Sequence, residues 1–147
     1  MPAFRFRLAK ALDWYREQCK IEEGRLANCV AALSAATECV ARLEAERLAV
    51  DRETIAQASI AGCELAALGL YRLGAAEAAA RLEEERRQRS SAVDRQRVVV
   101  QAARRRLKLL EKLRERRLAE HVQAEEREME NSAAESFLAK WVRTAAR

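Results

Sequence analysis

The sequence predicts an all-α protein, a long antiparallel coiled-coil hairpin of two helices. Charged residues make up 35% of the 147-residue chain and aromatic residues only 5%, a balance typical of long helices and coiled coils. Proline occurs once, at Pro2, and glycine four times, so few positions interrupt a helix. Apolar residues also recur in alternating three- and four-residue steps, which is the heptad pattern of a coiled-coil seam.

The first predicted helix covers about residues 4–68, and its apolar seam starts at Leu12. Nine of its first ten heptad positions are apolar, and Glu22 is the exception. The ten positions are Leu12, Tyr15, Cys19, Glu22, Leu26, Cys29, Leu33, Ala36, Val40 and Leu43. Beyond Arg47 the heptad phase fails, so we expect a four-residue slip in the seam, and such a stutter unwinds a supercoil without ending the helix. The weaker seam after the slip would consist of Leu48, Ile55, Ala58 and Leu65.

A turn is predicted at about residues 69–76, in the middle of the chain. Gly62, Gly69 and Gly74 cluster around it, and each costs a helix interior about 1 kcal/mol relative to alanine. The second helix is expected at about residues 77–142. Its seam would consist of Ala79, Leu82, Val93, Val100, Ala103, Leu107 and Leu110, interrupted by Arg86, Arg89 and Gln96. At about 1.5 Å per residue, each helix would be on the order of 100 Å long.

A turn at the middle of the chain would bring its two ends together. Phe4 and Leu8 would then face Trp141 and Phe137. Apart from Trp14, all the phenylalanine and tryptophan residues lie near these ends. We therefore expect the ends to pack through aromatic contacts.

The run RRRLKLLEKLRERRLAEH, residues 104–121, holds eight basic residues and five leucines. On a helical wheel Leu107 and Leu110 fall on the seam, whereas Leu109 and Leu113 fall on the opposite side. Cations surround these two outer leucines, and we call this surface the basic-leucine face. Its members are Arg105, Arg106, Lys108, Leu109, Lys112, Leu113, Arg116 and Arg117.

Two interpretations of the basic-leucine face stay open. It is a solvated surface with two incidental leucines, or a protein-docking patch with an apolar centre and a basic rim. The charge pattern favours docking. Residues 104–117 carry eight basic and two acidic side chains, whereas residues 120–130 carry five acidic side chains and one arginine.

Nucleic acid and a membrane surface are weaker candidates for the partner of this face. The basic run lies inside the seam and, apart from Gln101 at its edge, offers no amide side chain to read bases. A helix on a membrane surface would need a wide apolar face with aromatic anchors, and two leucines do not supply one.

The sequence also lacks the motifs of catalysis and of metal binding. It has no glycine-rich phosphate loop, no Ser-His-Asp set and no H-E-x-x-H motif, so we expect neither enzymatic activity nor a cofactor. None of the four cysteines forms a C-x-x-C pair and His121 is the only histidine, so we expect no zinc site. The cysteines are expected to be small buried apolar residues in a reducing cytosol. The sequence has no run of 18 apolar residues, so we expect no membrane-spanning helix.

Both ends of the chain resemble the flagellar export protein FliJ family. The N-terminal FRFRLAKALDWYREQCKIEE has that family's alternating aromatic and basic opening. RRRLKLLEKLRERRLAEH, followed by the acidic AEEREMENSAAE, resembles its C-terminal signature. The length and the two-helix layout also fit. SFLAKWVRTAAR, with its Trp141, departs from the family pattern.

The resemblance implies a non-enzymatic component of the flagellar type III export apparatus, cytoplasmic and peripheral at the inner-membrane face of that apparatus. Family members form a coiled coil similar to the central stalk of a rotary ATPase. They bind the hexameric export ATPase, the cytoplasmic domain of the export gate and export chaperones. The basic-leucine face is expected to contact the ATPase, and residues 30–52 the gate.

The same resemblance implies no nucleic-acid partner, and membrane association only through the apparatus. Three alternatives stay open: a stalk homologue of a virulence type III secretion system, a generic coiled-coil scaffold or dimerisation protein, and a basic helical DNA-associated protein.

Overall fold

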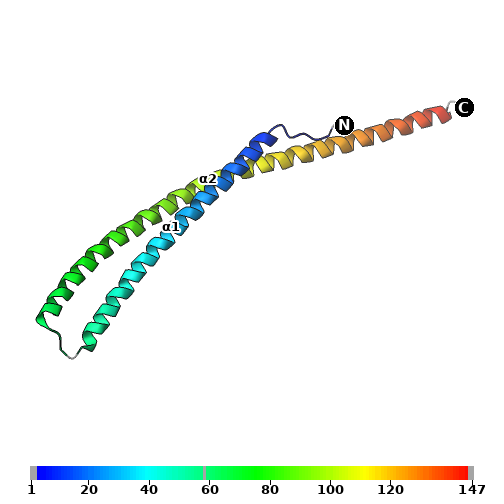
Figure 1. Ribbon diagram of the computed structural model, residues 1–147. Coiled ribbons are helices and arrows are strands. Elements are labelled where there is room, and N and C mark those ends of the chain that lie inside the picture. The colour runs from blue at the N-terminus through cyan, green and yellow to red at the C-terminus, as the bar shows by residue number, and fades with distance from the viewer. Residues whose placement is uncertain (1–2, 58, 146–147) are drawn as a thin grey trace. The chain divides into compact units, whose positions relative to one another are not determined.

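The computed structural model describes residues 3–57 and 59–145, and it confirms an all-α fold of two long helices packed against each other. Helix α1 spans Ala9–Ala56 and helix α2 spans Gly62–Ala145, with a short connection between them (Figure 1). The chain divides into two compact units. We call Lys20–Ala102 the hairpin unit, and Met1–Cys19 with Ala103–Arg147 the terminal unit.

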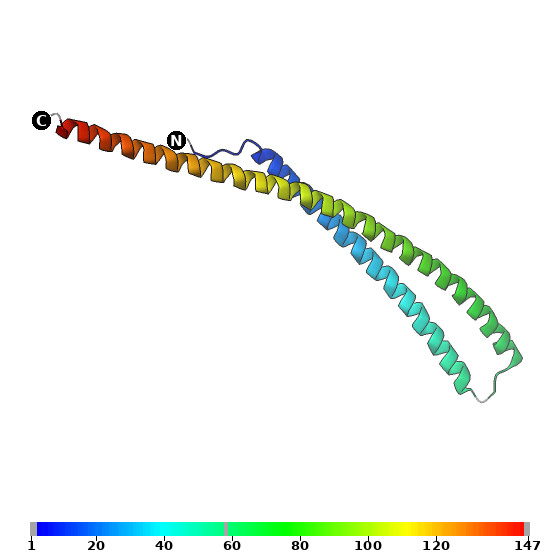
Figure 2. The same ribbon diagram turned by 180° about the vertical axis from the view of Figure 1, so that it is seen from behind.

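In the hairpin unit, α1 and α2 lie side by side and close their seam along the predicted heptads (Figures 1 and 2). Every predicted seam position of α1 from Glu22 to Leu43 is buried or half-buried. On α2 the most buried side chains are Ala75, Val93 and Val100. These side chains are small, so the core is one thin layer between two helices.

The predicted slip in the seam beyond Arg47 is wrong. Leu48, Ile55 and Leu65 are exposed, and Ala58 lies outside the described residues. The original heptad spacing instead continues to Val50 and Thr54, which are half-buried. The Thr54 hydroxyl also donates a hydrogen bond to the Val50 carbonyl at 2.7 Å, which satisfies this polar seam residue within α1.

The predicted turn at residues 69–76 is also wrong, because the connection follows Ala56 and α2 already begins at Gly62. Gly69 and Gly74 lie inside α2, and no described glycine has a positive φ. Two hydrogen bonds of Ala61, one through its amide and one through its carbonyl, fix the start of α2. The Ala61 amide donates to a Glu64 carboxylate oxygen at 3.1 Å, and the Ala61 carbonyl accepts from the Leu65 amide at 3.0 Å. This is half of a capping box, and it begins a helix despite the nearby glycines.

In the terminal unit, the N-terminal segment and the start of α1 pack along α2. Leu12 and Cys19 are buried, and Arg16 pairs with Glu111 across the two helices at 3.3 Å. The Phe4 ring meets the His121 ring edge-on, with the centroids 5.6 Å apart.

The predicted contact between Phe4 and Trp141 is therefore wrong. Because the connection comes earlier than predicted, the start of the chain pairs with an earlier part of α2. Phe137 and Trp141 are exposed on the last part of α2.

Two expectations about apolar residues also need correction. Cys19 is buried as expected, but Cys63 is exposed. The sequence has no uninterrupted run of 18 apolar residues. Helix α1 nevertheless contains an 18-residue window that is apolar enough on average, by length and composition alone, to cross a membrane. Core helices of soluble proteins pass the same test, so this property is weak support for a span.

Candidate protein-docking site

The structure places all eight members of the basic-leucine face on the surface of α2 in the terminal unit. Leu109 is 68% exposed and Leu113 is 36% exposed. Leu107 and Leu110 on the other side of the helix are half-buried in the seam. The helical wheel therefore predicted the orientation of these leucines, while their role in binding stays a prediction.

A groove adjoins this face, and the N-terminal segment forms one of its walls. The groove encloses about 840 Å³. Its lining consists of Ala3, Phe4, Arg5, Phe6, Arg7, Leu8, Leu113, Arg117, Glu120 and His121. Leu113 and Arg117 belong to both the groove and the basic-leucine face, so the two form one continuous surface. The N-terminal segment and the basic run of α2 thus meet at one place.

The wall exists because the chain before α1 is not helical. We predicted helix from about residue 4, but α1 begins at Ala9, where the Ala9 amide donates to the Phe6 carbonyl at 3.1 Å. Residues 3–6 have no regular structure, and residues 7 and 8 form a turn into the helix. In this segment Phe4 and Phe6 are half-buried, while Arg5 and Arg7 are exposed. The alternation in FRFR was the signal that could have predicted this wall.

The charges at the site are only partly compensated. Arg116 donates to Glu120 at 3.0 Å and Arg117 donates to the same carboxylate at 2.9 Å. The hydrogen bond from Arg116 is the largest cause that lowers the pKa of the Glu120 carboxyl, and the hydrogen bond from Arg117 is the next.

The other four cations of the face are Arg105, Arg106, Lys108 and Lys112, and within the described part of the chain they form no ion pair. The surface around Leu109 is therefore strongly positive, which favours an acidic partner.

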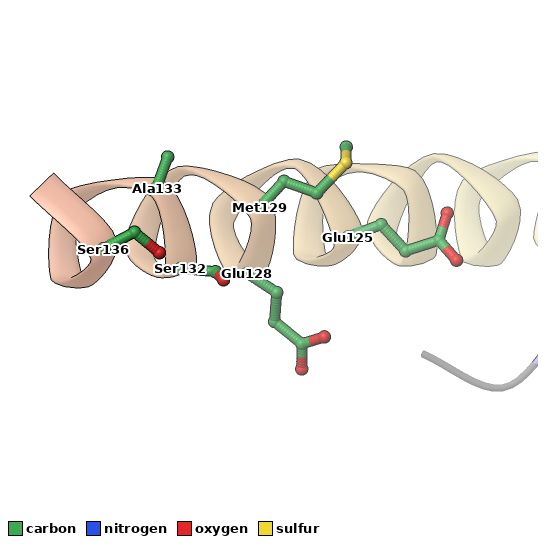
Figure 3. Close-up of a pocket in the computed structure, with 6 residues that line it drawn as sticks. All are labelled: Glu125, Glu128, Met129, Ser132, Ala133 and Ser136. Atoms are coloured by element: carbon green, nitrogen blue, oxygen red, sulfur yellow. The ribbon is translucent and has the colours of Figure 1, made fainter.

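A second hollow lies further along α2 and carries no comparable arrangement. It is lined by Glu125, Glu128, Met129, Ser132, Ala133 and Ser136. Figure 3 shows that all six residues stand on α2 itself, so the hollow is one side of a single helix. Among the described side chains, no group of three or more histidine, cysteine or acidic residues is arranged to hold a metal ion.

The fold defines a helical-hairpin protein, and its basic-leucine face is an exposed cationic surface. No protein-family model, curated protein or solved structure matches the chain. The case for a particular function therefore depends on the residues of the docking surface and on the resemblance of the two chain ends.

Proposed function

We propose that the chain is a non-enzymatic coiled-coil stalk of a flagellar type III export apparatus, and that it binds the hexameric export ATPase. One observation carries this proposal: the exposed Leu109 and Leu113 lie within a ring of cations that continues into the groove beside Phe4. An apolar centre with a basic rim is suited to a protein partner with an acidic surface.

The resemblance supplies the identity of that partner. The segments FRFRLAKALDWYREQCKIEE and RRRLKLLEKLRERRLAEH carry the likeness to the FliJ family, and both contribute to the groove. On this proposal the stalk couples the ATPase to the export gate in the cytoplasm and also escorts export chaperones. Residues 30–52 of α1 are the proposed contact with the gate.

The proposal is tested by measuring how the purified chain stimulates the export ATPase. The test variant combines Leu109→Ala, Leu113→Ala and Arg116→Glu. We expect the variant to lose most of the stimulation because it binds the ATPase roughly tenfold or more weakly. Each truncated apolar anchor and the reversed charge cost about 1 kcal/mol or more of binding free energy. Circular dichroism confirms that its helix content is unchanged.

A matched control variant lies in the hairpin unit and combines Leu65→Ala, Leu70→Ala and Arg81→Glu. Leu65 and Leu70 are exposed on α2, and the Arg81 side chain is 79% exposed, as is that of Arg116. The control should stimulate the ATPase like the unaltered chain. Equal stimulation by the test variant would remove the basic-leucine face from the proposal, and no binding by the unaltered chain would favour a generic scaffold.

A further inference from the structure

The charge on the outer side of α2 changes sign along the helix. Residues 104–117 carry eight basic and two acidic side chains, whereas residues 120–130 carry five acidic side chains and one arginine. Both stretches belong to one uninterrupted helix within the terminal unit. A partner surface that is acidic throughout would attract the first stretch and repel the second.

Side chains from both stretches point to the same side of α2, and we call this side the two-sign face. At 100° per residue its members fall within about 60° of Leu109, with Lys108 and Glu126 at its edge, about 100° away. The half-buried Leu107, Leu110 and His121 fall about 100–160° away from Leu109, on the side that packs in the unit. All members of the two-sign face are exposed. They are Arg105, Arg106, Lys108, Leu109, Lys112, Leu113, Arg116, Glu120, Gln123, Glu126, Arg127 and Glu130.

The two-sign face is complementary to its own reverse. A two-fold axis at the level of Leu118 would place a second copy of α2 antiparallel to the first, and facing residues would then have numbers that sum to about 236. Cations of each copy then face carboxylates of the other, and each contact occurs twice, because the interface is isologous. The contacts are Arg116 with Glu120, Arg105 with Glu130, and Lys108 and Lys112 on either side of Glu126.

The remaining members of the face also fit this arrangement. Leu109, which is 68% exposed in the single chain, would face Arg127 of the second copy, and Leu113 would face Gln123. Long polar side chains cover apolar groups with their aliphatic stems while their polar ends stay in water. The one cation of the acidic stretch therefore meets a leucine and not another cation.

Most of the charges needed for these contacts are available in the single chain. Within the part of the chain that the structure describes, Arg105, Lys112, Glu126 and Glu130 form no ion pair. Association therefore breaks no existing pair at these four positions. A parallel arrangement would instead place cations against cations and carboxylates against carboxylates, which is unfavourable. The charge pattern thus selects both a second copy and its antiparallel direction.

We propose that two copies of the chain associate through the two-sign face, with their α2 helices antiparallel from Arg105 to Glu130. The contact is about 40 Å long, at 1.5 Å per residue. Exposed ion pairs each contribute little and are screened by salt, so the dimer forms at low salt and dissociates as the salt concentration rises.

This inference concerns the surface proposed for the ATPase, but it does not rest on that proposal. In the dimer the second copy covers Leu109, so self-association and docking to any other protein through this face exclude each other.

Sedimentation equilibrium of the full chain at low salt tests this proposal. About 100 μM protein populates any dimer with a micromolar Kd, and a chain that is purely monomeric there would overturn the proposal. Two variants each make the face one sign throughout: Arg105→Glu with Lys112→Glu, and Glu126→Lys with Glu130→Lys. Each should weaken self-association roughly tenfold or more, because like charges then face each other. Unchanged self-association in both variants would also overturn the proposal.

Combining the substitutions tests the direction of the helices. A chain with all four substitutions has the opposite charge pattern, and it should self-associate again because antiparallel copies are complementary once more. An equimolar mixture of the two double variants should also form dimers, one chain of each kind. Failure of the four-substitution chain to recover would contradict the antiparallel pairing.

The matched control is Glu77→Lys with Glu84→Lys in the hairpin unit. Both side chains are exposed, and the change in net charge equals that of Glu126→Lys with Glu130→Lys. The control should self-associate like the unaltered chain, and an equal loss would assign the effect to net charge and overturn the proposal. Circular dichroism checks that the helix content of every variant is unchanged.

The variant Glu126→Lys with Glu130→Lys also separates this proposal from the previous one. It keeps every residue of the basic-leucine face, so it should stimulate the ATPase while its self-association is lost. If the unaltered chain dimerises as described but never stimulates the ATPase, the ATPase proposal fails and the dimer stands.

Discussion

The Gln96 side chain of α2 donates hydrogen bonds to Glu22 of α1, at 2.6 Å to its carboxylate and 3.2 Å to its backbone carbonyl. Glu22 was the one polar residue among the first ten seam positions of α1, and Gln96 was one of three polar interruptions in the seam of α2. The two exceptions therefore face each other. A polar pair inside an apolar seam favours one register of two helices, because any other alignment breaks the hydrogen bonds between Gln96 and Glu22.

Removing one member of this pair should destabilise the hairpin unit. We expect Gln96→Leu to lower the free energy of unfolding by about 1 kcal/mol, because the half-buried Glu22 carboxylate loses a hydrogen bond. Urea denaturation followed by circular dichroism measures this change. Gln101→Leu, at an exposed position of α2, is the control and should be nearly neutral. A Gln96→Leu variant that is more stable than its parent would show that the pair does not stabilise this register.

Replacing two interior glycines of α2 should stabilise the protein. A Cβ atom built at Gly69 or Gly74 meets nothing within 4 Å, and neither backbone has a positive φ. We expect Gly69→Ala and Gly74→Ala to raise the free energy of unfolding by about 1 kcal/mol each, through helix propensity. Gly62→Ala, at the first residue of α2, should gain less. Destabilisation by either interior variant would indicate that the chain bends at these glycines.

The Glu120 carboxyl should titrate with a pKa below that of an ordinary glutamate side chain, because Arg116 and Arg117 donate hydrogen bonds to its charged form. A lowered folded-state pKa means that the pairing is present at neutral pH and is lost as the pH falls through that pKa. Carboxyl carbon NMR measures the midpoint. Arg116→Gln combined with Arg117→Gln should raise the pKa back towards the ordinary glutamate value, and an unchanged midpoint would contradict this origin of the shift.

The sequence was sufficient to predict the seam because burial follows a simple period. Each heptad position from Leu12 to Leu43 is buried or half-buried, including the polar Glu22. The slip was predicted because the heptad phase fails beyond Arg47, although Val50 and Thr54 keep the spacing. The longer periodicity was thus a better guide than one charged seam position.

The connection could not be placed from glycine content. Glycine weakens a helix by about 1 kcal/mol, which packing against α1 offsets. The helix start depends instead on Glu64, which reaches back to the amide of Ala61, and alanine is not a residue that marks a helix start.

The error in the connection changed which residues meet at the candidate site. The wheel oriented Leu109 and Leu113 correctly, because their direction depends only on α2 itself. The groove needs the N-terminal segment beside His121, and that pairing depends on where the chain turns.

The unequal lengths of the helices, 48 residues in α1 and 84 in α2, have a consequence for the stability of the last part of α2. Every described side chain from residue 126 to residue 143 is exposed. Most of the stability of a helix in a protein comes from the packing of one face rather than from helix propensity. This end of α2 therefore depends mainly on the backbone hydrogen bonds that it shares with the packed part of the helix, and any surface that covers it would stabilise it further.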